Sequence, residues 1–149
     1  VWLDDPSLTL RLWPGRRSPL RVVIGENVSF PASAGIFSDG VPTEIFTSQP
    51  VEDDKSVRYT VADFSRPVIP QVLNALYREG IIGLLVEGGT ATLQSFIDAG
   101  LWDETRIETA PVELGDGVAA PVLSCAEKRL AISYGLHLVE NFSRTEKLS

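Results

Sequence analysis

The sequence is poor in the side chains that form crosslinks or bind soft metals. It contains one cysteine, Cys125, one histidine, His137, and no methionine. A single cysteine excludes a disulfide within the chain, which is typical of proteins in a reducing compartment. No apolar run is long enough to span a bilayer, and the chain does not open with a secretory signal. We therefore expect a cytoplasmic protein with no membrane partner.

Basic residues are too few for nucleic-acid binding. The chain has 13 Lys and Arg against 20 Asp and Glu, a formal net charge of −7, and no basic run. Proteins that bind DNA or RNA depend on clustered Lys and Arg, so we expect no nucleic-acid partner. An anionic ligand would have to be held by local donors, because the field of the whole chain repels it.

The scarcity of histidine and cysteine also limits catalysis and metal binding. His137 lies in a strand pattern far from any obvious nucleophile, which favours a cross-strand or surface role. Cys125 has no nearby Cys or His to complete a metal site, so we predict no metal. A small loop or core residue is the better interpretation of this cysteine.

The apolar content is sufficient for a folded core. Hydrophobic residues make up 44% of the chain and charged residues 22%, which suits one α/β domain over residues 1–149. The patterns predict strands at 20–24, 44–47, 57–61, 81–86 and 105–110, and helices at 67–78 and from Thr90 to about Gly100. Strand 57–61, helix 67–78 and strand 81–86 would form a right-handed βαβ unit.

The β-rich segment 130–142 is predicted to be one bent strand or a hairpin that turns near Tyr134-Gly135. A strand there would form or lie near a sheet edge, and exposed edges pair with other copies. We therefore expect a homodimer with residues 130–142 at or near its interface. The alternative is an internal hairpin that covers its own edge.

The stretch around Glu87 has the clearest functional pattern. Residues 81–86 are apolar apart from Gly83, which suits a strand buried on both faces of a parallel sheet. Glu87 and Gly88-Gly89 follow, and then Leu93, Phe96 and Ile97 stand at helical spacing. The stretch therefore predicts strand, acidic residue, two glycines and helix, in that order.

This arrangement can bind a phosphate. The first amides of a helix lack internal partners, and glycines before them let a phosphate approach the backbone. Thr90 and Thr92 could add hydroxyl donors. The alternative is a tight turn in which Thr90 is the N-cap. Glu87 would lie in the ligand crevice at the end of a parallel strand or, alternatively, would cap the helix.

Two further candidates lie near the start of the chain. Asp4 and Asp5 precede Pro6 and could act as an acid or a ligand, although an Asp-Asp-Pro turn explains them equally well. Arg11 could clamp a phosphate with two hydrogen bonds, or it could be a surface arginine at the end of a strand.

Taken together, these pieces resemble a known family. Leu3-Asp4-Asp5-Pro6-Ser7-Leu8-Thr9-Leu10-Arg11 is similar to its "DDP-x-L-T-x-R" segment, and Leu84-Leu85-Val86-Glu87-Gly88-Gly89 is similar to its second hallmark. Pro19 to Ile24 and Gly115-Asp116-Gly117 to Pro121 also match, in the right order. The family is the reductase domain of the bifunctional riboflavin-biosynthesis deaminase/reductase proteins.

The resemblance implies a dihydrofolate reductase-like fold: a mixed, mostly parallel sheet flanked by helices, with C-terminal antiparallel strands. It also implies reduction of 5-amino-6-(5-phosphoribosylamino)uracil to the ribitylamino compound, with NADPH as the hydride donor. By the same resemblance the family's members form dimers through their reductase domains.

The site roles also come from the resemblance. Asp4 would lie beside the nicotinamide and relay a proton, and Glu87 would face the substrate as a second catalytic residue. Leu8 and Arg11 would contact the substrate, with Arg11 on its 5′-phosphate. The cofactor pyrophosphate would be held by the start of the helix, at Gly88, Gly89, Thr90, Ala91, Thr92, Leu93, Gln94 and Ser95.

The sequence departs from the family in two places. Gly25-Glu26 stands where the family often has Asp and a hydroxyl residue, and a carboxylate there would not help to bind an adenosine 2′-phosphate. The family's first strand and helix, and the H-x-E and P-C-x-x-C zinc ligands of its deaminase domain, have no counterpart in residues 1–149. We therefore expect the C-terminal part of a reductase domain from a longer protein. Another reductase of the same superfamily, or a non-catalytic nucleotide-binding or assembly module, is the alternative.

Overall fold

The computed structural model describes residues 8–10, 15–27, 34–35, 39–53, 56–113 and 115–145. The chain divides into two compact units, Val1–Ile82 and Gly83–Ser149. Each unit contains a three-stranded sheet, parallel in the first unit and antiparallel in the second.

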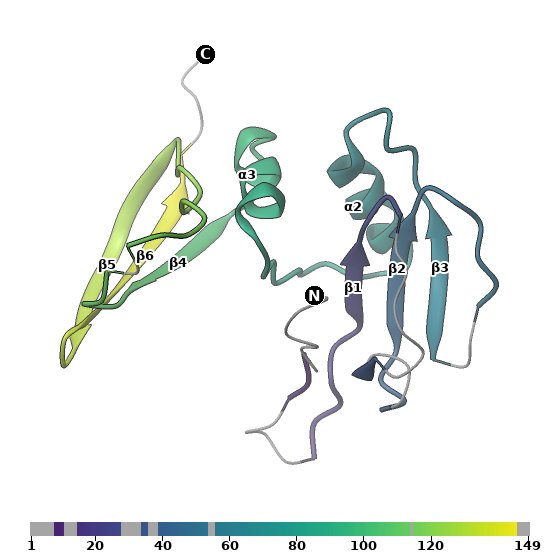
Figure 1. Ribbon diagram of the computed structural model, residues 1–149, viewed down its shortest axis with the longest axis horizontal. Coiled ribbons are helices and arrows are strands. Elements are labelled where there is room, and N and C mark those ends of the chain that lie inside the picture. The colour runs from purple at the N-terminus through teal and green to yellow at the C-terminus, as the bar shows by residue number, and fades with distance from the viewer. Residues whose placement is uncertain are drawn as a thin grey trace. The chain divides into compact units, whose positions relative to one another are not determined.

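Among its described residues, the first unit is built on a parallel sheet and helix α2 (Figure 1). Its strands lie in the order β1 (Arg21–Ile24), β2 (Thr43–Thr47) and β3 (Val57–Val61), and helix α2 (Val68–Arg78) follows β3. The predicted strands 20–24, 44–47 and 57–61 and the helix 67–78 are confirmed within one residue at each end. The central strand β2 is buried at all five positions.

Helix α2 has clear physical causes at both ends. Pro67 is its N-cap and Pro70 lies in its first turn, where a missing N–H costs no intrahelical hydrogen bond. Gly80, just past the end, has φ +82°, the left-handed conformation that glycine adopts without strain. The buried face of α2 carries Val72 and Leu76, which pack with Phe46 of β2. Burial of these three side chains contributes roughly 2 kcal/mol each.

The opposite face of the same sheet has a smaller apolar cluster. Val23, Ala34, Ile45 and Val57 are buried there, and Tyr59 packs against them. Successive residues of a strand point to opposite faces, so Ile45 belongs to this cluster and its neighbour Phe46 to the other. Strand β2 therefore holds both layers of the unit together.

Two polar clusters accompany the apolar core, and the sequence patterns did not predict either. In the first, the Glu44 carboxylate is 1% exposed and accepts hydrogen bonds from Thr60 Oγ1 and Arg58 Nη2, both at 2.7 Å. Arg58 also pairs with Glu79 just past the end of α2, at 2.6 Å. Its hydrogen bonds to Glu79 and Glu44 raise the pKa of Arg58 above its ordinary value, so its positive charge is permanent.

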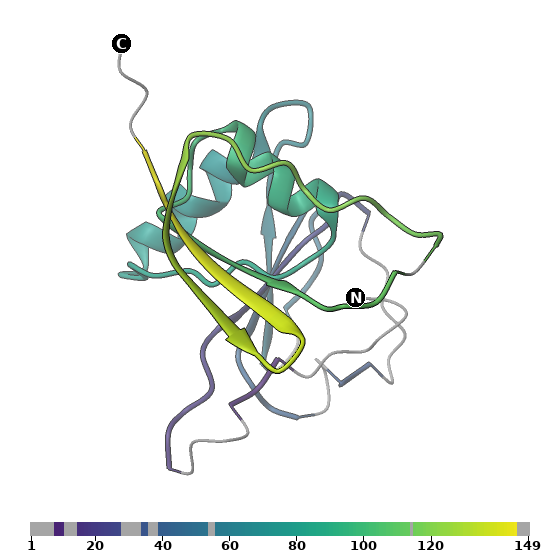
Figure 2. The same ribbon diagram turned by 90° about the vertical axis from the view of Figure 1, so that its left-hand side faces the viewer.

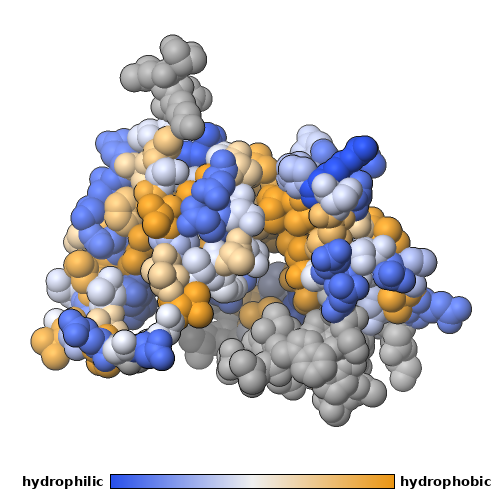
Figure 3. Space-filling model, turned by 45° about the horizontal axis from the view of Figure 1, so that its top comes forward, coloured by the Kyte–Doolittle hydropathy of each residue, from blue (hydrophilic) through white to orange (hydrophobic). Residues whose placement is uncertain are grey.

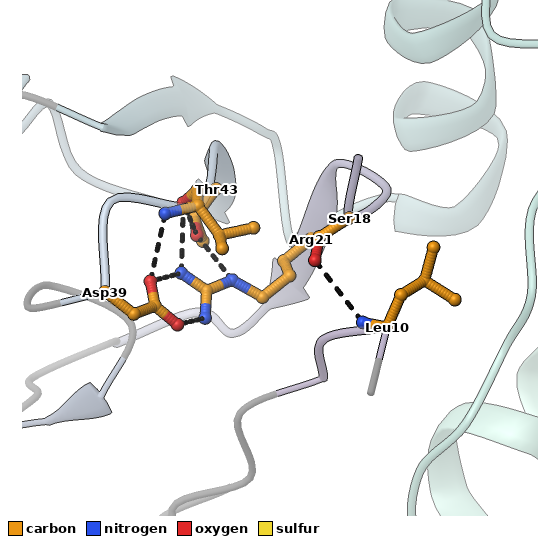
Figure 4. Close-up of polar contacts among 6 residues, drawn as sticks. Leu10, Ser18, Arg21, Asp39 and Thr43 are labelled. Atoms are coloured by element: carbon orange, nitrogen blue, oxygen red, sulfur yellow. Dashed lines mark hydrogen bonds and ion pairs between the residues drawn. The ribbon is translucent and has the colours of Figure 1, made fainter. Parts of the chain in front are cut away.

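The second polar cluster surrounds Arg21 at the start of β1 (Figure 4). Its guanidinium donates to both oxygens of Asp39, at 2.6 and 2.8 Å, and Nε donates to Thr43 Oγ1 at 2.9 Å. The hydrogen bond from Arg21 and a backbone N–H from Val41 lower the pKa of Asp39. The cluster fastens the chain before β2 to the first residue of β1. Nearby, the Leu10 N–H donates to Ser18 Oγ at 3.3 Å.

The second unit consists of helix α3 (Thr90–Asp98) and an antiparallel sheet (Figure 2). Its strands are β4 (Glu104–Thr109), β5 (Ala126–Tyr134) and β6 (His137–Arg144), in the order β4-β6-β5. Strands β5 and β6 form a hairpin that turns at Gly135, where φ is +61°. Of the two predictions for 130–142, the hairpin is confirmed and the single bent strand is wrong. Strand β4 confirms the prediction at 105–110, shifted by one residue.

The predicted strand 81–86 is wrong, and with it the predicted βαβ unit. Residues 81–89 form no strand, and the side chains of Ile82 and Leu85 are 92% and 82% exposed. A strand exists only where a neighbour takes up its backbone hydrogen bonds, and within the described residues no ladder includes 81–86. Residues 81–86 have the apolar composition of a buried strand, but composition does not show which neighbouring strand would pair with them.

The Glu44 cluster predicts unequal losses for its two charges. Arg58→Met leaves the buried Glu44 carboxylate without a cation, so we expect a loss of about 3 kcal/mol in the free energy of unfolding. Glu44→Gln leaves Arg58 paired with Glu79, so we expect about 1 kcal/mol. Urea unfolding measures both. Arg66→Met, which removes a surface ion pair to Asp63, is the control and should change stability by less than about 0.5 kcal/mol. Equal losses at residues 44 and 58 would contradict this account.

Candidate functional site

The start of helix α3 offers free hydrogen-bond donors. Gly89 is the N-cap, with φ −71° and ψ 165°, and Thr90 is the first helical residue. The amides of Thr92 and Leu93 donate to the Gly89 carbonyl at 3.1 and 3.3 Å. Within the described part of the chain, the amides of Thr90 and Ala91 have no acceptor. These two donors lie at the positive end of the helix dipole, where an anion is stabilised.

Neither glycine before α3 is required by the fold. Gly88 and Gly89 both lack the left-handed φ that favours glycine, unlike Gly100 at the end of the helix, where φ is +64°. A Cβ at residue 88 would lie 3.6 Å from Thr92 Cβ, an ordinary contact, and a Cβ at residue 89 would meet nothing within 4 Å. The alternative in which Thr90 is the N-cap is wrong, because Gly89 holds that position. What the two glycines leave is a bare backbone that a ligand can approach.

The side chains of α3 differ in what they can still donate. The Thr90 hydroxyl donates to the Ala119 carbonyl at 2.5 Å, and the Ser95 hydroxyl donates to the Ala91 carbonyl at 2.8 Å. The Gln94 amide bonds Asp98 and the backbone of Val122. Among the polar side chains predicted to bind the cofactor, only the Thr92 hydroxyl has no partner within the described residues. The Thr90 hydroxyl thus donates within the chain in this structure, and its role as a donor to phosphate stays a prediction.

Glu87 is exposed directly before this turn. Its carboxylate makes no ion pair or hydrogen bond within the described residues. The alternative that Glu87 caps α3 is therefore wrong. An exposed carboxylate beside two open amides can accept a hydrogen bond from a bound molecule, or exchange a proton with it.

The predicted site residues near the start of the chain are described only in part. Asp4 and Arg11 lie outside the described residues. Leu8 is 39% exposed and has φ +45°, a left-handed conformation that residues other than glycine rarely adopt. Such conformations cluster at ligand sites, and nothing in the sequence pattern pointed to this one.

The carboxyl ends of β1 and β2 meet around a single carbonyl group. The Glu26 carbonyl accepts hydrogen bonds from Thr47 Oγ1, Ser48 Oγ and Ser48 N, at 3.1, 2.7 and 3.1 Å. Ligands of α/β sheets bind at this end of the strands. The bonds fix the backbone of Gly25-Glu26, the pair at which the sequence departs from the family. The hydroxyl residues Thr47 and Ser48 at the carboxyl end of β2 were a signal that the sequence patterns did not reveal.

The remaining candidates have structural surroundings. His137 of β6 and Glu108 of β4 face each other across the sheet, with Nδ1 and Oε1 3.5 Å apart and both side chains about half exposed, which confirms a cross-strand surface role. In the described ranges, no three His, Cys, Asp or Glu side chains lie close enough to hold a metal ion. None of the helices described is long and apolar enough to cross a membrane.

Comparison with known proteins gives relatives that share much of the sequence. The riboflavin biosynthesis protein RibD of Bacillus amyloliquefaciens is 36% identical over 135 residues, which cover 85% of this chain and 36% of that protein. The 2,5-diamino-6-ribosylamino-4(3H)-pyrimidinone 5′-phosphate reductase of Archaeoglobus fulgidus is 33% identical over 130 residues, which cover 77% of this chain and 59% of that protein. The chain thus spans about a third to three fifths of the length of these two relatives.

Solved structures give the fold. The bifunctional diaminohydroxyphosphoribosylaminopyrimidine deaminase/5-amino-6-(5-phosphoribosylamino)uracil reductase of Thermotoga maritima superposes with a TM-score of 0.81 at 22% identity, over 95% of this chain and 42% of that one. The dihydrofolate reductase of Enterococcus faecalis superposes with a TM-score of 0.50 at 16% identity, over 85% of this chain and 75% of that one. The predicted fold class is confirmed. Since the sequence model of the RibD C-terminal domain matches residues 1–140, this chain belongs to the RibD C-terminal domain family.

Proposed function

We propose that this chain is the reductase part of a riboflavin-biosynthesis enzyme that reduces 5-amino-6-(5-phosphoribosylamino)uracil with NADPH. Membership of the RibD C-terminal domain family supports the reaction class. The observation that carries the proposal is the start of α3. Two glycines without a glycine-specific backbone conformation precede two amides that have no acceptor within the described residues. The family match runs across both compact units, which supports one reductase domain over residues 1–149.

The residues at the start of α3 fit a dinucleotide cofactor. The amides of Thr90 and Ala91 are suited to the pyrophosphate, the bare backbone of Gly88-Gly89 allows close approach, and the Thr92 hydroxyl is available as a further donor. The next three residues hold the start of the helix in place through hydrogen bonds to neighbouring backbone groups: Leu93 to Gly89, Ser95 to Ala91, and Gln94 to Val122. When bound, NADPH supplies the hydride for C1′ of the opened ribose.

Substrate recognition is assigned from the family motifs. Arg11 binds the 5′-phosphate with its planar fork of donors, and Leu8 contacts the substrate. Asp4 lies beside the nicotinamide and relays the proton that accompanies reduction. Glu87 faces the substrate, and its exposed carboxylate without a partner supports this role.

A second substrate is possible within the same reaction class. The Archaeoglobus relative is named for a 2,5-diaminopyrimidinone, which carries an amino group where the uracil compound carries an oxygen. The 36% identity to a RibD protein supports the uracil compound for this chain. Turnover of both compounds by the full-length protein, with NADPH and with NADH, decides between the substrates. The same assay tests whether Glu26 shifts the choice of cofactor, and no turnover of either compound would support a non-catalytic module.

Gly89→Val tests the cofactor site without disturbing the fold. A side chain at residue 89 has open space and an ordinary φ, so the variant should keep its melting temperature. It should nevertheless obstruct the approach to the backbone and weaken NADPH binding more than tenfold, about 1.4 kcal/mol or above. Gly83→Val is the matched control, because residue 83 is equally open and precedes the motif. Unchanged NADPH affinity in the folded Gly89 variant would show that the pyrophosphate does not bind at this turn.

Asp4 and Arg11 should affect different kinetic constants. Arg11→Ala should mainly raise KM, because a phosphate contact stabilises the ground state and the transition state alike. Asp4→Asn should mainly lower kcat, because proton transfer belongs to the chemical step. Steady-state and single-turnover oxidation of NADPH measures both. The reverse pattern would show that the two roles are exchanged.

The protein is proposed to form a homodimer through the edge of its second sheet. Strand β5 has β6 on one side, and no further strand pairs with it among the described residues. Leu130, Ile132 and Tyr134 of β5 are 48%, 37% and 61% exposed, and apolar residues reach the surface of this unit in Figure 3. An edge strand with apolar side chains favours pairing with a second copy.

Light scattering on the full-length protein tests the dimer, and Ile132→Lys should shift it to monomer by placing a charge at the proposed interface. Leu136→Lys, in the exposed turn beside β5, is the matched control and should remain dimeric. A proline at Leu138 is not a usable test, because β6 is the central strand and would itself be broken. A monomeric parent, or an Ile132→Lys variant that stays dimeric, would contradict the proposal.

A further inference from the structure

The loop between β4 and β5 is fastened to helix α3 at two points. The Thr90 hydroxyl donates to the Ala119 carbonyl at 2.5 Å. One turn later, Gln94 pairs with the backbone of Val122: the Val122 N–H donates to Oε1 at 2.8 Å, and Nε2 donates to the Val122 carbonyl at 3.3 Å. Residues i and i+4 of a helix lie on the same face, so both fastenings are on one side of α3. We call residues 119–122 the strap.

The order of the fastenings sets the direction of the strap. Ala119 lies beside Thr90 and Val122 lies beside Gln94, so the strap runs parallel to the helix. Residues 115–118 therefore continue toward the N-terminal end of α3, and in Figure 2 this loop runs along the helix and extends past that end. The Val118 side chain is 86% exposed, and Gly115 and Gly117 have φ +71° and +158°.

The fastening and a bond to Asp98 use both N–H donors of the Gln94 amide. One N–H goes to Asp98 Oδ1 at 2.7 Å and the other to the Val122 carbonyl, while the oxygen accepts from Val122. The side chain thus has no N–H left to donate to a phosphate oxygen while the strap is in place. A role for Gln94 in cofactor binding must act through the strap.

We propose that Gln94 and Thr90 are positioning residues that hold the strap along α3 and so place residues 115–118 beside the first turn of the helix, where they help to retain the cofactor pyrophosphate. The proposal rests on the function proposed above. The open amides of Thr90 and Ala91 lie in the turn that the strap reaches. A cofactor bound there is enclosed on one side by a segment whose position depends on two side chains.

Gln94→Leu tests the strap in the full-length protein, because leucine has a similar size and no hydrogen bonds. Gln71→Leu is a matched control in the first unit. Gln71 of α2 pairs with the backbone of Asp63 in the same two-point manner, with both hydrogen bonds at 2.9 Å. Thr90→Val is a second variant, which removes only the bond to Ala119 while keeping the shape of the side chain.

The readouts are amide hydrogen exchange at Val122 and the dissociation constant for NADPH and NADH, measured by fluorescence titration. We expect Gln94→Leu to speed amide exchange at Val122 and to raise the dissociation constants of NADPH and NADH at least fivefold. Thr90→Val should also raise both dissociation constants. Both cofactors should lose affinity, because they carry the same pyrophosphate. The Gln71 control should change neither readout.

Four results would overturn the proposal. Faster exchange at Val122 with unchanged dissociation constants would show that the strap serves folding alone. A loss of affinity for only one of the two cofactors would show that the strap acts at the adenosine ribose, where NADPH and NADH differ, and not at the pyrophosphate. A parent protein that binds neither cofactor would refute the proposed function and this inference together, whereas binding by the parent with no loss in either variant refutes only the strap.

Discussion

The first unit depends on keeping the polar side chains of strand β2 paired, although the strand is buried along its whole length. Thr43 accepts from Arg21, Glu44 binds Arg58 and Thr60, and Thr47 donates to the Glu26 carbonyl. No buried side-chain nitrogen or oxygen within the described residues lacks a partner. An unpaired carboxylate at Glu44 would cost several kcal/mol, so its partners on β3 are fixed together with the strand.

This pairing also specifies register. Because side chains alternate between the faces of a sheet, a slip of β2 by one residue would move Ile45 out of its apolar cluster and put Glu44 against Val23 and Val57. The backbone ladder alone does not distinguish neighbouring registers strongly. The buried charges do, and they hold the carboxyl end of β2, with its Thr47-Ser48 pair, at a fixed position beside Glu26.

The sequence predicted the parts of this fold that depend on neighbours in the chain. Pro67 and Gly80 define the ends of α2, Gly100 follows the end of α3, and Gly135 turns the last hairpin, because each acts through its own backbone conformation. Segment 81–86 could not be predicted in the same way, since a strand needs a partner that local composition does not identify. The Glu44 cluster was missed for a similar reason: its partners lie 14 and 16 residues away.

In the candidate site, too, the features set by neighbouring residues could be predicted and those set by distant residues could not. Glycine chemistry and helical periodicity located the start of α3, while the fate of the Thr90 hydroxyl depended on the path of a loop 29 residues further on. Asp4 and Arg11 stand on the family resemblance alone, because they lie outside the described residues.

The lack of any folding requirement at Gly88-Gly89 has an evolutionary consequence. A copy of this domain released from selection for its ligand could exchange both glycines and still fold, express and melt as before. Stability screens are therefore blind to damage at this position. Among descendants of the chain, retention of the pair would therefore point to selection on the ligand site, since the space around either residue would admit a side chain.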